Sequence, residues 1–494
     1  MRHDDARSDT IPLHPARRTV LAGAAWAVPA IALTAASPAY AGSNSALITV
    51  TTPQQQIVAT GATTVTATVT TEAGAPAVGK AVSFTAPSGS VVTPSIATTD
   101  GNGVATAQVN LGTPWRTPGS TVVVTATVGG DSKAQALTVL GANALAAGAW
   151  DSGLRSSGTT RTTLTQIELV FPSPVVQIAS SVLVLLEDGT VWTRGSNSFG
   201  QLGIGSTSTG REAWGIVPNL TGVTQIASGF LRSNYAVRSD GTLWVWGYNG
   251  FGQLGLGTTT SATVPTQVAS LSNVTQVDAQ RSTAYALVGG AVYAWGQSDY
   301  GQVGNGTSGG TAREVSPVQV VAGGVAQIAT NTSRCAALKT DGSVLIWGLS
   351  YATSPAPFTG VSGVTSLGAA STTMYARLTD GSAQSWLANS SGQGGNGDTT
   401  TSLTMARPIV SLTSGVRVLA GSGVDQGNQT GTGYAWMDDG SLRSWGHNRY
   451  GEVADGTTTN RTSPLTPALP TGTPPIVGLT DVYGDVFAVV VKPD

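Results

Sequence analysis

Few side chains in this sequence are of the types that carry out acid–base or nucleophilic chemistry. Two of the three histidines, His3 and His14, lie in the first 41 residues, which leaves His447 as the one histidine of the remaining chain. A serine or cysteine nucleophile normally works with a histidine base, so any such site would have to use His447. This residue lies in a Gly-His-Asn turn where other copies of a repeat carry Ser, Tyr, Gln or Leu. We therefore interpret His447 as a loop residue.

Metal and thiol chemistry are also poorly supported. Cys335 is the single cysteine, which excludes an intramolecular disulfide, and its apolar surroundings predict a small buried strand residue. A zinc site needs a cluster of His, Cys or carboxylate ligands, which the sequence does not offer. Asp100 and Asn102 are too few for the oxygen shell of calcium and are typical of a hairpin turn. We expect no metal ion and no cofactor.

Two patterns leave catalysis open as an alternative. Gly200, Gly203 and Gly205 are spaced like a phosphate-binding loop, but the pattern recurs in several copies without a following helix, which favours a structural turn. Asp438 and Asp439 are adjacent carboxylates, and glycosidases use carboxylates in pairs, although turns account for most aspartates here. We expect a non-catalytic protein and keep a polysaccharide lyase or hydrolase as the alternative.

Three arginines recur at nearly equal distances before a tryptophan, which makes them candidates for binding. Arg232, Arg281 and Arg334 precede Trp246, Trp295 and Trp347 by 14, 14 and 13 residues. Equal offsets in successive repeats predict side chains on one arc of one face, where an acidic partner can dock. The alternative is three solvated arginines with no binding role.

Irregular segments supply the other candidates, because binding residues concentrate on variable loops of a regular scaffold. Tyr351 and Phe358 replace the usual glycine motif in a shortened repeat, and the loop 421–433 is extended. Phe230 would add an apolar anchor beside the first arginine. The candidate partner-binding residues are Phe230, Arg232, Arg281, Arg334, Tyr351 and Asp425.

The composition indicates short strands rather than long helices. Glycine occupies 64 positions and charged residues make up 10% of the chain, while the 12 tryptophans argue against disorder. A net charge of −2 gives no basic surface for nucleic acid. The sequence therefore predicts an all-β protein that has no nucleic-acid partner.

Residues 1–41 have the features of an export signal. A polar segment ends in Arg17-Arg18, an Ala-rich apolar stretch follows, and small residues precede Ala41. The arginine pair followed by Val20-Leu21 resembles a twin-arginine signal, with an ordinary secretion signal as the alternative. We expect cleavage after Ala41 and a secreted or surface-associated product with no membrane span.

Residues 44–141 show the alternation of a small β-sandwich. The stretch 65–69 alternates apolar and polar residues, and turn clusters at 72–76, 87–89 and 100–103 separate such stretches. The strings at 66–70, 79–84 and 98–105 resemble the bacterial Ig-like domains of the invasin and intimin type. That resemblance implies a rigid spacer in a surface protein.

The rest of the chain, 142–494, is built from one repeat with a period of about 50 residues. Each copy has an Asp-Gly-Ser/Thr turn, a short strand and a tryptophan that we expect to pack between neighbouring sheets. The turns begin at Asp188, Asp240, Asp341, Asp380 and Asp439, with a variant at Gly289. The tryptophans assigned to the copies are Trp192, Trp246, Trp295, Trp347, Trp386 and Trp445, and Trp150 supplies a seventh.

A glycine motif follows several of these tryptophans, at 197–205, 249–257, 299–306 and 448–453. Together the two motifs resemble the repeats of the regulator of chromosome condensation family; kelch repeats share the period but lack the Gly-Gln-Leu-Gly string. The resemblance implies a seven-bladed β-propeller behind the Ig-like β-sandwich. Because residues 146–150 begin in mid-repeat and 476–491 look like the missing half, we expect strands from both segments to complete one blade.

These features predict a secreted, non-catalytic binding protein that is a monomer. The propeller would engage an extracellular protein or glycan, with the Ig-like domain as spacer. A secreted protein inhibitor of an extracellular enzyme is an alternative. The family name suggests nucleotide exchange on a nuclear GTPase, but the export signal and the lack of a basic tail argue against that transfer.

Overall fold

The computed structural model describes residues 47–51, 56–58, 62–88, 90–110, 120–140, 144–148, 161–166, 171–180, 183–207, 211–229, 232–422, 431–470, 473–480 and 486–491. These residues form strands and turns without an α-helix, which confirms the all-β class. Accordingly, no described segment is a helix that could cross a bilayer. The chain divides into two units, one ending at Leu140 and one that contains Gly141–Asp494. The expected export signal lies outside the described residues.

The first unit consists of two sheets. The four-stranded sheet contains, in spatial order, β1 (Leu47–Thr51), β3 (Ala62–Thr70), β7 (Val104–Asn110) and β5 (Val91–Thr93). The five-stranded sheet contains β2 (Gln56–Val58), β9 (Asp131–Leu140), β8 (Thr121–Val128), β4 (Ala81–Thr85) and β6 (Ile96–Thr98).

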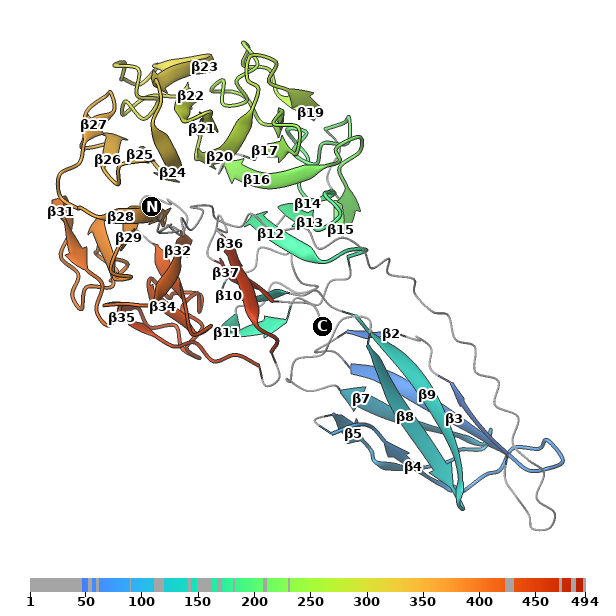
Figure 1. The fold of residues 1–494 in the computed structure, drawn as a ribbon. Coiled ribbons are helices and arrows are strands. Elements are labelled where there is room, and N and C mark those ends of the chain that lie inside the picture. Colours follow the sequence, from blue (N-terminus) through green and yellow to red (C-terminus); the bar gives the residue numbers. More distant parts are fainter. Residues whose placement is uncertain are drawn as a thin grey trace, which may run out of the picture. The chain divides into compact units, whose positions relative to one another are not determined.

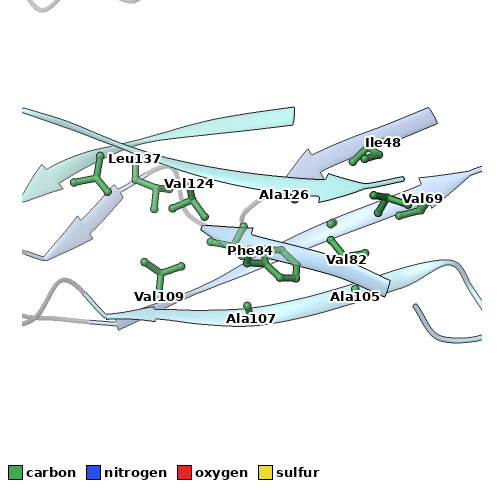
Figure 2. Close-up of a cluster of buried hydrophobic side chains, with 14 of the residues drawn as sticks. Ile48, Val69, Val82, Phe84, Ala105, Ala107, Val109, Val124, Ala126 and Leu137 are labelled. Atoms are coloured by element: carbon green, nitrogen blue, oxygen red, sulfur yellow. The ribbon is translucent and has the colours of Figure 1, made fainter. Parts of the chain in front are cut away.

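The two sheets of this unit share one core because their strands alternate apolar and polar residues. Val65, Val69 and Val124 are fully buried, and Phe84 lies among them (Figure 2). Alternate residues of a strand point to opposite faces, so the threonines between these valines face outwards. At the turn after β6, the Asp100 carboxylate accepts hydrogen bonds from the N–H groups of Asn102 and Val104, both at 2.9 Å, as expected for a hairpin turn.

Seven four-stranded sheets make up the second unit, and we call them blades 1 to 7. Blade 1 comprises β12 (Val175–Ser180), β13 (Leu183–Leu186), β14 (Val191–Gly195) and β15 (Arg211–Ile216). Blade 2 comprises β16 (Val223–Gly229), β17 (Ser233–Arg238), β18 (Leu243–Gly247) and β19 (Ala262–Gln267). Blade 3 comprises β20 (Val274–Gln280), β21 (Thr283–Val288), β22 (Ala291–Gln297) and β23 (Arg313–Val321).

The remaining blades follow the same order, from the first to the fourth strand. Blade 4 comprises β24 (Val325–Asn331), β25 (Arg334–Lys339), β26 (Val344–Gly348) and β27 (Ala356–Pro357). Blade 5 comprises β28 (Val364–Ala369), β29 (Thr373–Leu378), β30 (Ala383–Leu387) and β31 (Ser402–Pro408). Blade 6 comprises β32 (Val416–Ser422), β33 (Thr432–Met437), β34 (Leu442–Gly446) and β35 (Arg461–Leu465). Blade 7 comprises β36 (Ile476–Thr480), β37 (Val486–Val491), β10 (Ala144–Gly148) and β11 (Arg161–Gln166).

The blades form a closed ring in which the first strand of each blade lies nearest the centre (Figure 1). Each of these inner strands contacts the next, from β12 through β32 to β36, and β36 contacts β12 again. In blade 7, β10 pairs with β37 from Ala144 opposite Val490 to Gly148 opposite Val486. The prediction that two distant segments complete one blade is therefore confirmed. Closure of this kind leaves no free inner edge between the first blade and the last.

Asp-Gly turns join the second and third strands of the blades, as their sequence predicts. In blade 2 the Asp240 carboxylate accepts hydrogen bonds from the N–H and hydroxyl groups of Thr242, at 3.0 and 2.6 Å. Gly241 has a φ of 78°, a conformation that glycine adopts without steric cost. These hydrogen bonds to the ionised carboxylate lower the pKa of Asp240.

A fully or almost fully buried tryptophan lies between each pair of neighbouring blades from blade 1 to blade 6. The five are Trp246, Trp295, Trp347, Trp386 and Trp445. The indole N–H of Trp295 donates to the carbonyl of Gln253, at 2.8 Å, and the same bond joins Trp246 to Gln201, Trp347 to Gln302 and Trp445 to Gln393. The glutamine carbonyl in the glycine motif of one blade thus accepts a hydrogen bond from the tryptophan of the next blade, which explains why the two motifs recur together.

Trp192 was assigned to this set from the sequence, and the structure shows that assignment to be wrong. Trp192 lies opposite Ile216, as Trp244 lies opposite Gln267 in blade 2, so it corresponds to Trp244 rather than to Trp246. Like Trp244, it is half-buried and donates its indole N–H to the turn threonine two residues earlier. The spacing from the turn glycine distinguishes the two positions in the sequence, because Trp192 follows its glycine by three residues whereas Trp246 follows its glycine by five. Trp150 lies outside the described residues.

Glutamine side chains on the inner strands form a second link between blades, which the sequence analysis missed. The Gln276 amide donates to the carbonyl of Ile328 at 2.7 Å and accepts from the N–H of Ile328 at 3.0 Å. Gln177, Gln225 and Gln327 bind the next inner strand in the same way. A register shift after the first residue of each inner strand re-aims this side chain. We call these four side chains the glutamine links.

Candidate binding face of the propeller

One face of the propeller carries the loops that vary most between blades. Strands alternate in direction, so the turns after the first strands and the loops after the third strands share one end of every blade. The Asp-Gly turns lie at the other end. We call the first of these ends the loop face. Its described turns and loops include Arg232 and residues 281–282, 332–333, 370–372, 196–207, 248–261, 298–312, 349–355, 388–401 and 447–460.

Arg232 is the predicted site residue that the structure places most openly on this face. Its side chain is exposed, donates a hydrogen bond to the Ser198 hydroxyl at 3.2 Å, and lies 5.9 Å from the centre of the Phe199 ring. Arg232 therefore belongs to blade 2 but contacts the loop of blade 1. Its φ of 67° falls in the left-handed region, which is costly for a residue with a Cβ.

Aromatic rings from two neighbouring loops gather beside Arg232. The Phe199 and Tyr248 rings meet edge to face with centres 4.7 Å apart, and Tyr248 meets Phe251 in the same way at 6.3 Å. Phe199 remains 38% exposed. We call Phe199, Arg232, Tyr248 and Phe251 the aromatic–arginine patch.

The glycine motif holds these loops in one conformation. The N–H groups of Phe199 and Phe251 each donate to the side-chain oxygen of the glutamine two residues later, at 2.9 Å in both loops. Gly250 is required beneath the patch because a Cβ there would overlap the Tyr248 hydroxyl. The rings are therefore presented by a rigid backbone, which lowers the entropy cost of binding to them.

The other two arginines do not extend this patch along an arc. Arg281 has a φ of 50° and is half-buried at the next turn. Arg334 is instead the first residue of β25, is 9% exposed, and donates from Nε to the Leu349 carbonyl at 2.6 Å. Burial lowers the pKa of the Arg334 guanidinium. The expectation of three equivalent arginines is wrong because the turns before them differ in length, so that Arg334 occupies the strand position of Ser233.

Tyr351 and Phe358 fill a gap instead of lining a surface. The short loop of blade 4 lacks the glycine motif, and the Phe358 ring stacks on Trp386 with centres 5.0 Å apart. Tyr351 contacts Phe358 edge to face at 6.2 Å, and burial raises its pKa to about 12. The indole N–H of Trp386 has no hydrogen-bond partner among the described residues, because no glutamine carbonyl is offered there.

Two further predicted residues lie outside the described part of the chain. Phe230 falls in the undescribed stretch 230–231, and Asp425 falls in the undescribed stretch 423–430. Their roles stay predictions. The described residues of the extended loop, Gly421 and Ser422, belong to β32.

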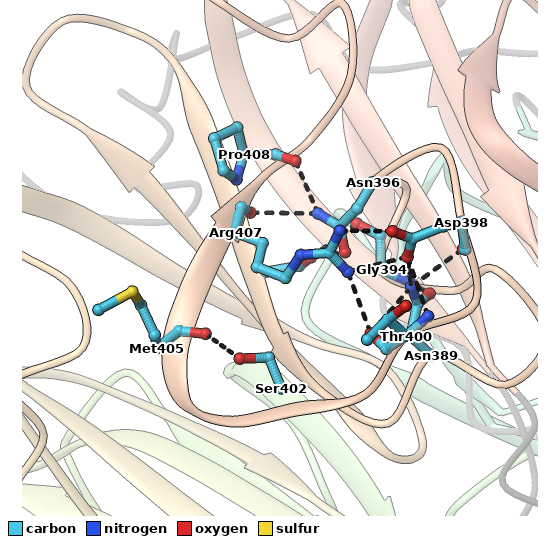
Figure 3. Close-up of polar contacts among 10 residues, drawn as sticks. Asn389, Gly394, Asn396, Asp398, Thr400, Ser402, Met405, Arg407 and Pro408 are labelled. Carbon is cyan, nitrogen blue, oxygen red and sulfur yellow. Dashed lines mark hydrogen bonds and ion pairs between the residues drawn. The ribbon is translucent and has the colours of Figure 1, made fainter.

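Two arginines in other blades are paired with carboxylates at this face. In blade 5 the Arg407 guanidinium binds both carboxylate oxygens of Asp398, and Asn389, Asn396 and Thr400 surround the pair (Figure 3). The hydrogen bonds from Arg407 hold the pKa of Asp398 well below its ordinary value. Arg461 and Asp455 form the same kind of pair in blade 6. These arginines stabilise their own loops.

His447 has a local partner that explains its loop position. Its Nδ1 lies 3.1 Å from the carboxylate of Glu452, the residue that replaces the motif glutamine in blade 6. Glu452 also accepts the N–H of Tyr450 at 2.7 Å, as the glutamine does elsewhere. In the described stretches, His, Cys, Asp and Glu nowhere gather in a group that would hold a metal ion. Cys335 is fully buried in β25, where burial raises the pKa of its thiol.

The two hollows found on the described surface lie away from the patch. One of about 350 Å³ lies between blades 1 and 2 beside Trp244 and Val264. Another of about 420 Å³ lies by the Asp341 turn and Phe358. The first is lined mostly by apolar side chains, and the second includes Lys339, Asp341 and Ser343 in its lining.

The middle of the propeller matches a known repeat. Residues 240–286 and 289–338 match the regulator of chromosome condensation (RCC1) repeat, and residues 223–253 match a second form of it. The RCC1 domain-containing protein RUG3, mitochondrial, of Arabidopsis thaliana is 38% identical over 93 residues, which cover 18% of this chain and 20% of that protein. The human X-linked retinitis pigmentosa GTPase regulator is 36% identical over 89 residues, which cover 17% and 8%. The match thus spans no more than a fifth of these curated RCC1-repeat relatives.

Solved structures of RCC1-type propellers share the fold. Human WBSCR16 has a TM-score of 0.59 at 19% identity and covers 71% of this chain and 99% of its own. Prp20p of Saccharomyces cerevisiae, a structure whose title also describes binding to Gsp1p and histones, has a TM-score of 0.60 at 17% identity and covers 72% and 92%. At these identities the likeness establishes the propeller alone.

Proposed function

We propose that this chain is a secreted, non-catalytic protein-binding propeller that uses its loop face, with the first unit as an Ig-like spacer. The observation that carries the proposal is the aromatic–arginine patch, because exposed aromatic rings and arginine on a rigid loop are the residues that dominate protein interfaces. The RCC1 repeats support it, since proteins with these repeats include one named as a GTPase regulator.

Binding is tested by capture with the full chain from the medium of the producing cells. We expect specific proteins to be retained by the parent and lost from a Phe199→Ala, Arg232→Ala double variant of unchanged melting temperature. A matched control replaces Arg449 and Tyr450, an exposed cation–π pair on blade 6, with alanine. Equal capture by all three proteins would contradict a binding role for the patch.

Secretion is tested separately, because it rests on the sequence of residues 1–41 alone. Replacing Arg17 and Arg18 with lysine should retain the protein inside bacterial cells if the twin-arginine route is used. Release into the medium in spite of this change would favour the ordinary secretion route. A protein that stays in the cells without any substitution would refute secretion.

A further inference from the structure

We propose that the partner of the aromatic–arginine patch is a protein segment that carries a carboxylate beside a large apolar side chain. This inference rests on the proposed function and specifies the chemistry of the partner. Its basis is the combination, at one place on the loop face, of an arginine that no described carboxylate pairs with and a partly exposed aromatic ring.

The charge of the patch is not neutralised within the described chain. Arg232 makes a hydrogen bond to Ser198 and a contact with Phe199, and no carboxylate of the described residues pairs with it. Arg407 and Arg461 on the same face each bind an aspartate. A guanidinium beside an apolar ring is the arrangement that binds a partner's carboxylate with both hydrogen bonds and charge.

The backbone of Arg232 gives further support. A left-handed φ of 67° suits glycine, and several neighbouring turns of this protein do use glycine at such angles. An arginine at this position costs stability. Arg281 carries the same kind of cost at the next turn, with a φ of 50°, so the strain supports the proposal only together with the exposed side chain of Arg232.

A second polar group at the base of the patch also lacks a partner. The amide nitrogen of Gln253 is buried without a hydrogen bond among the described residues. In blade 5 the equivalent Gln393 donates its amide N–H to the Thr372 hydroxyl, in the turn after the first strand. Blade 2 has Arg232 in that turn instead, so the buried Gln253 amide lacks the hydroxyl acceptor that Thr372 supplies in blade 5.

The geometry favours a protein segment over a glycan. Sugars stack on flat, open ring faces, whereas here the rings meet edge to face at 65° and 73° and Arg232 lies over Phe199. Ring edges and gaps of this kind accept aromatic and aliphatic side chains. The Arg232 guanidinium, which no described carboxylate pairs with, then selects an acidic neighbour.

The test is a selection of random displayed peptides on the full-length protein, followed by binding of the selected peptides as synthetic pairs with Glu or Gln at each acidic position. We expect enriched peptides to place Asp or Glu next to a large apolar residue. We also expect about tenfold weaker binding after either the Glu→Gln change in the peptide or Arg232→Gln in the protein.

Two variants keep the result interpretable. Arg232→Gly relieves the left-handed strain, so we expect its melting temperature to equal or exceed the parent's while peptide binding is lost. Arg449→Gln should leave binding unchanged. Enriched peptides without acidic residues, or peptides indifferent to Arg232, would overturn this inference and leave the proposed function standing. Failure to enrich any peptide would count against both.

Discussion

Asp278, on the inner strand of blade 3, is a charged residue at a position where other blades have a small one. Equivalent positions on other inner strands hold small residues, namely Ala227, Ala329, Gly368 and Ala420. The Asp278 carboxylate accepts the N–H of Thr330 at 3.1 Å. Burial raises the pKa of Tyr285 and of the Cys335 thiol, and the charge of Asp278 adds to this rise. Burial raises the pKa of Asp278 to about 6.

This raised pKa predicts a protein that gains stability from Asp278 on mild acidification. The folded state binds the proton more tightly than the unfolded state, so the ionised carboxylate costs free energy above pH 6, and the cost disappears as the pH falls towards 4. A shift of about two units corresponds to about 3 kcal/mol. We expect Asp278→Asn to raise the free energy of unfolding near neutral pH by up to that amount, and by little near pH 4, in urea titrations.

Asp398→Asn is the matched control for Asp278, since Arg407 lowers the pKa of that carboxylate. The stability that the ionised Asp398 carboxylate contributes is present above its ordinary pKa and is lost as the pH falls through its lowered pKa. Asp398→Asn should therefore lower the free energy of unfolding at neutral pH and should approach the parent's value in acid. If the change in the free energy of unfolding depended on pH in the same way in both variants, burial would not be the cause of the raised pKa of Asp278.

The tryptophans between blades allow a comparison of two similar substitutions. Trp295 donates to the Gln253 carbonyl at 2.8 Å, whereas the Trp386 N–H has no partner among the described residues. Both lose a similar volume on change to phenylalanine, but only Trp295→Phe breaks a hydrogen bond. We expect Trp295→Phe to lower the free energy of unfolding by about 1 kcal/mol more than Trp386→Phe. Equal losses in chemical denaturation would mean that the hydrogen bond adds nothing to packing.

At the scale of the element, the glutamine links explain how neighbouring inner strands stay in register. We expect Gln276→Met, which keeps the length of the side chain, to lower the free energy of unfolding by about 1–3 kcal/mol because two backbone groups of Ile328 lose their partners. Ser366 occupies the same position in blade 5, so Ser366→Ala is the control and should change stability little. If the denaturant midpoint fell equally in both variants, the hydrogen bonds of the glutamine links would not be what stabilises the inner strands.

The sequence predicted strands and turns well, because both depend on local chemistry. Asp-Gly turns, alternating valines and the buried Cys335 follow from neighbouring residues, and each is found as expected. The roles of Trp192 and Arg334 were predicted wrongly, since offsets along the chain do not register a bulge or a change in turn length. The link formed by Gln276 was missed although Val-Thr-Gln-Ile/Val strings are visible in the sequence, because its partner lies 52 residues away.

At the scale of the whole molecule, the closed ring makes stability depend on blade 7. Deleting 476–494 removes β36 and β37 and leaves β10 without its partner. We expect an aggregating product that melts without cooperativity, whereas deleting 492–494 alone should leave the melt unchanged. A sharp, reversible calorimetric transition for the longer deletion would contradict the need for closure.

The propeller itself was predictable from the repeat, and solved structures confirm the fold. The aromatic–arginine patch was only partly predictable. Arg232 stood out by its spacing, but Phe199 and Tyr248 belong to regular motif copies and become distinctive only when two loops meet in space. Secretion, the Ig-like family of the first unit and the identity of the partner stay predictions.

The pairing of β10 with β37 also determines how the ring would respond to mechanical force. Ala144 lies opposite Val490, so a pull that separates these two ends loads the hydrogen bonds one after another, like a zipper, and not all together in shear. Such a geometry yields at low tension. A propeller tethered on the β10 side alone keeps its blades intact under flow, whereas one stretched between both strands would open at blade 7 first.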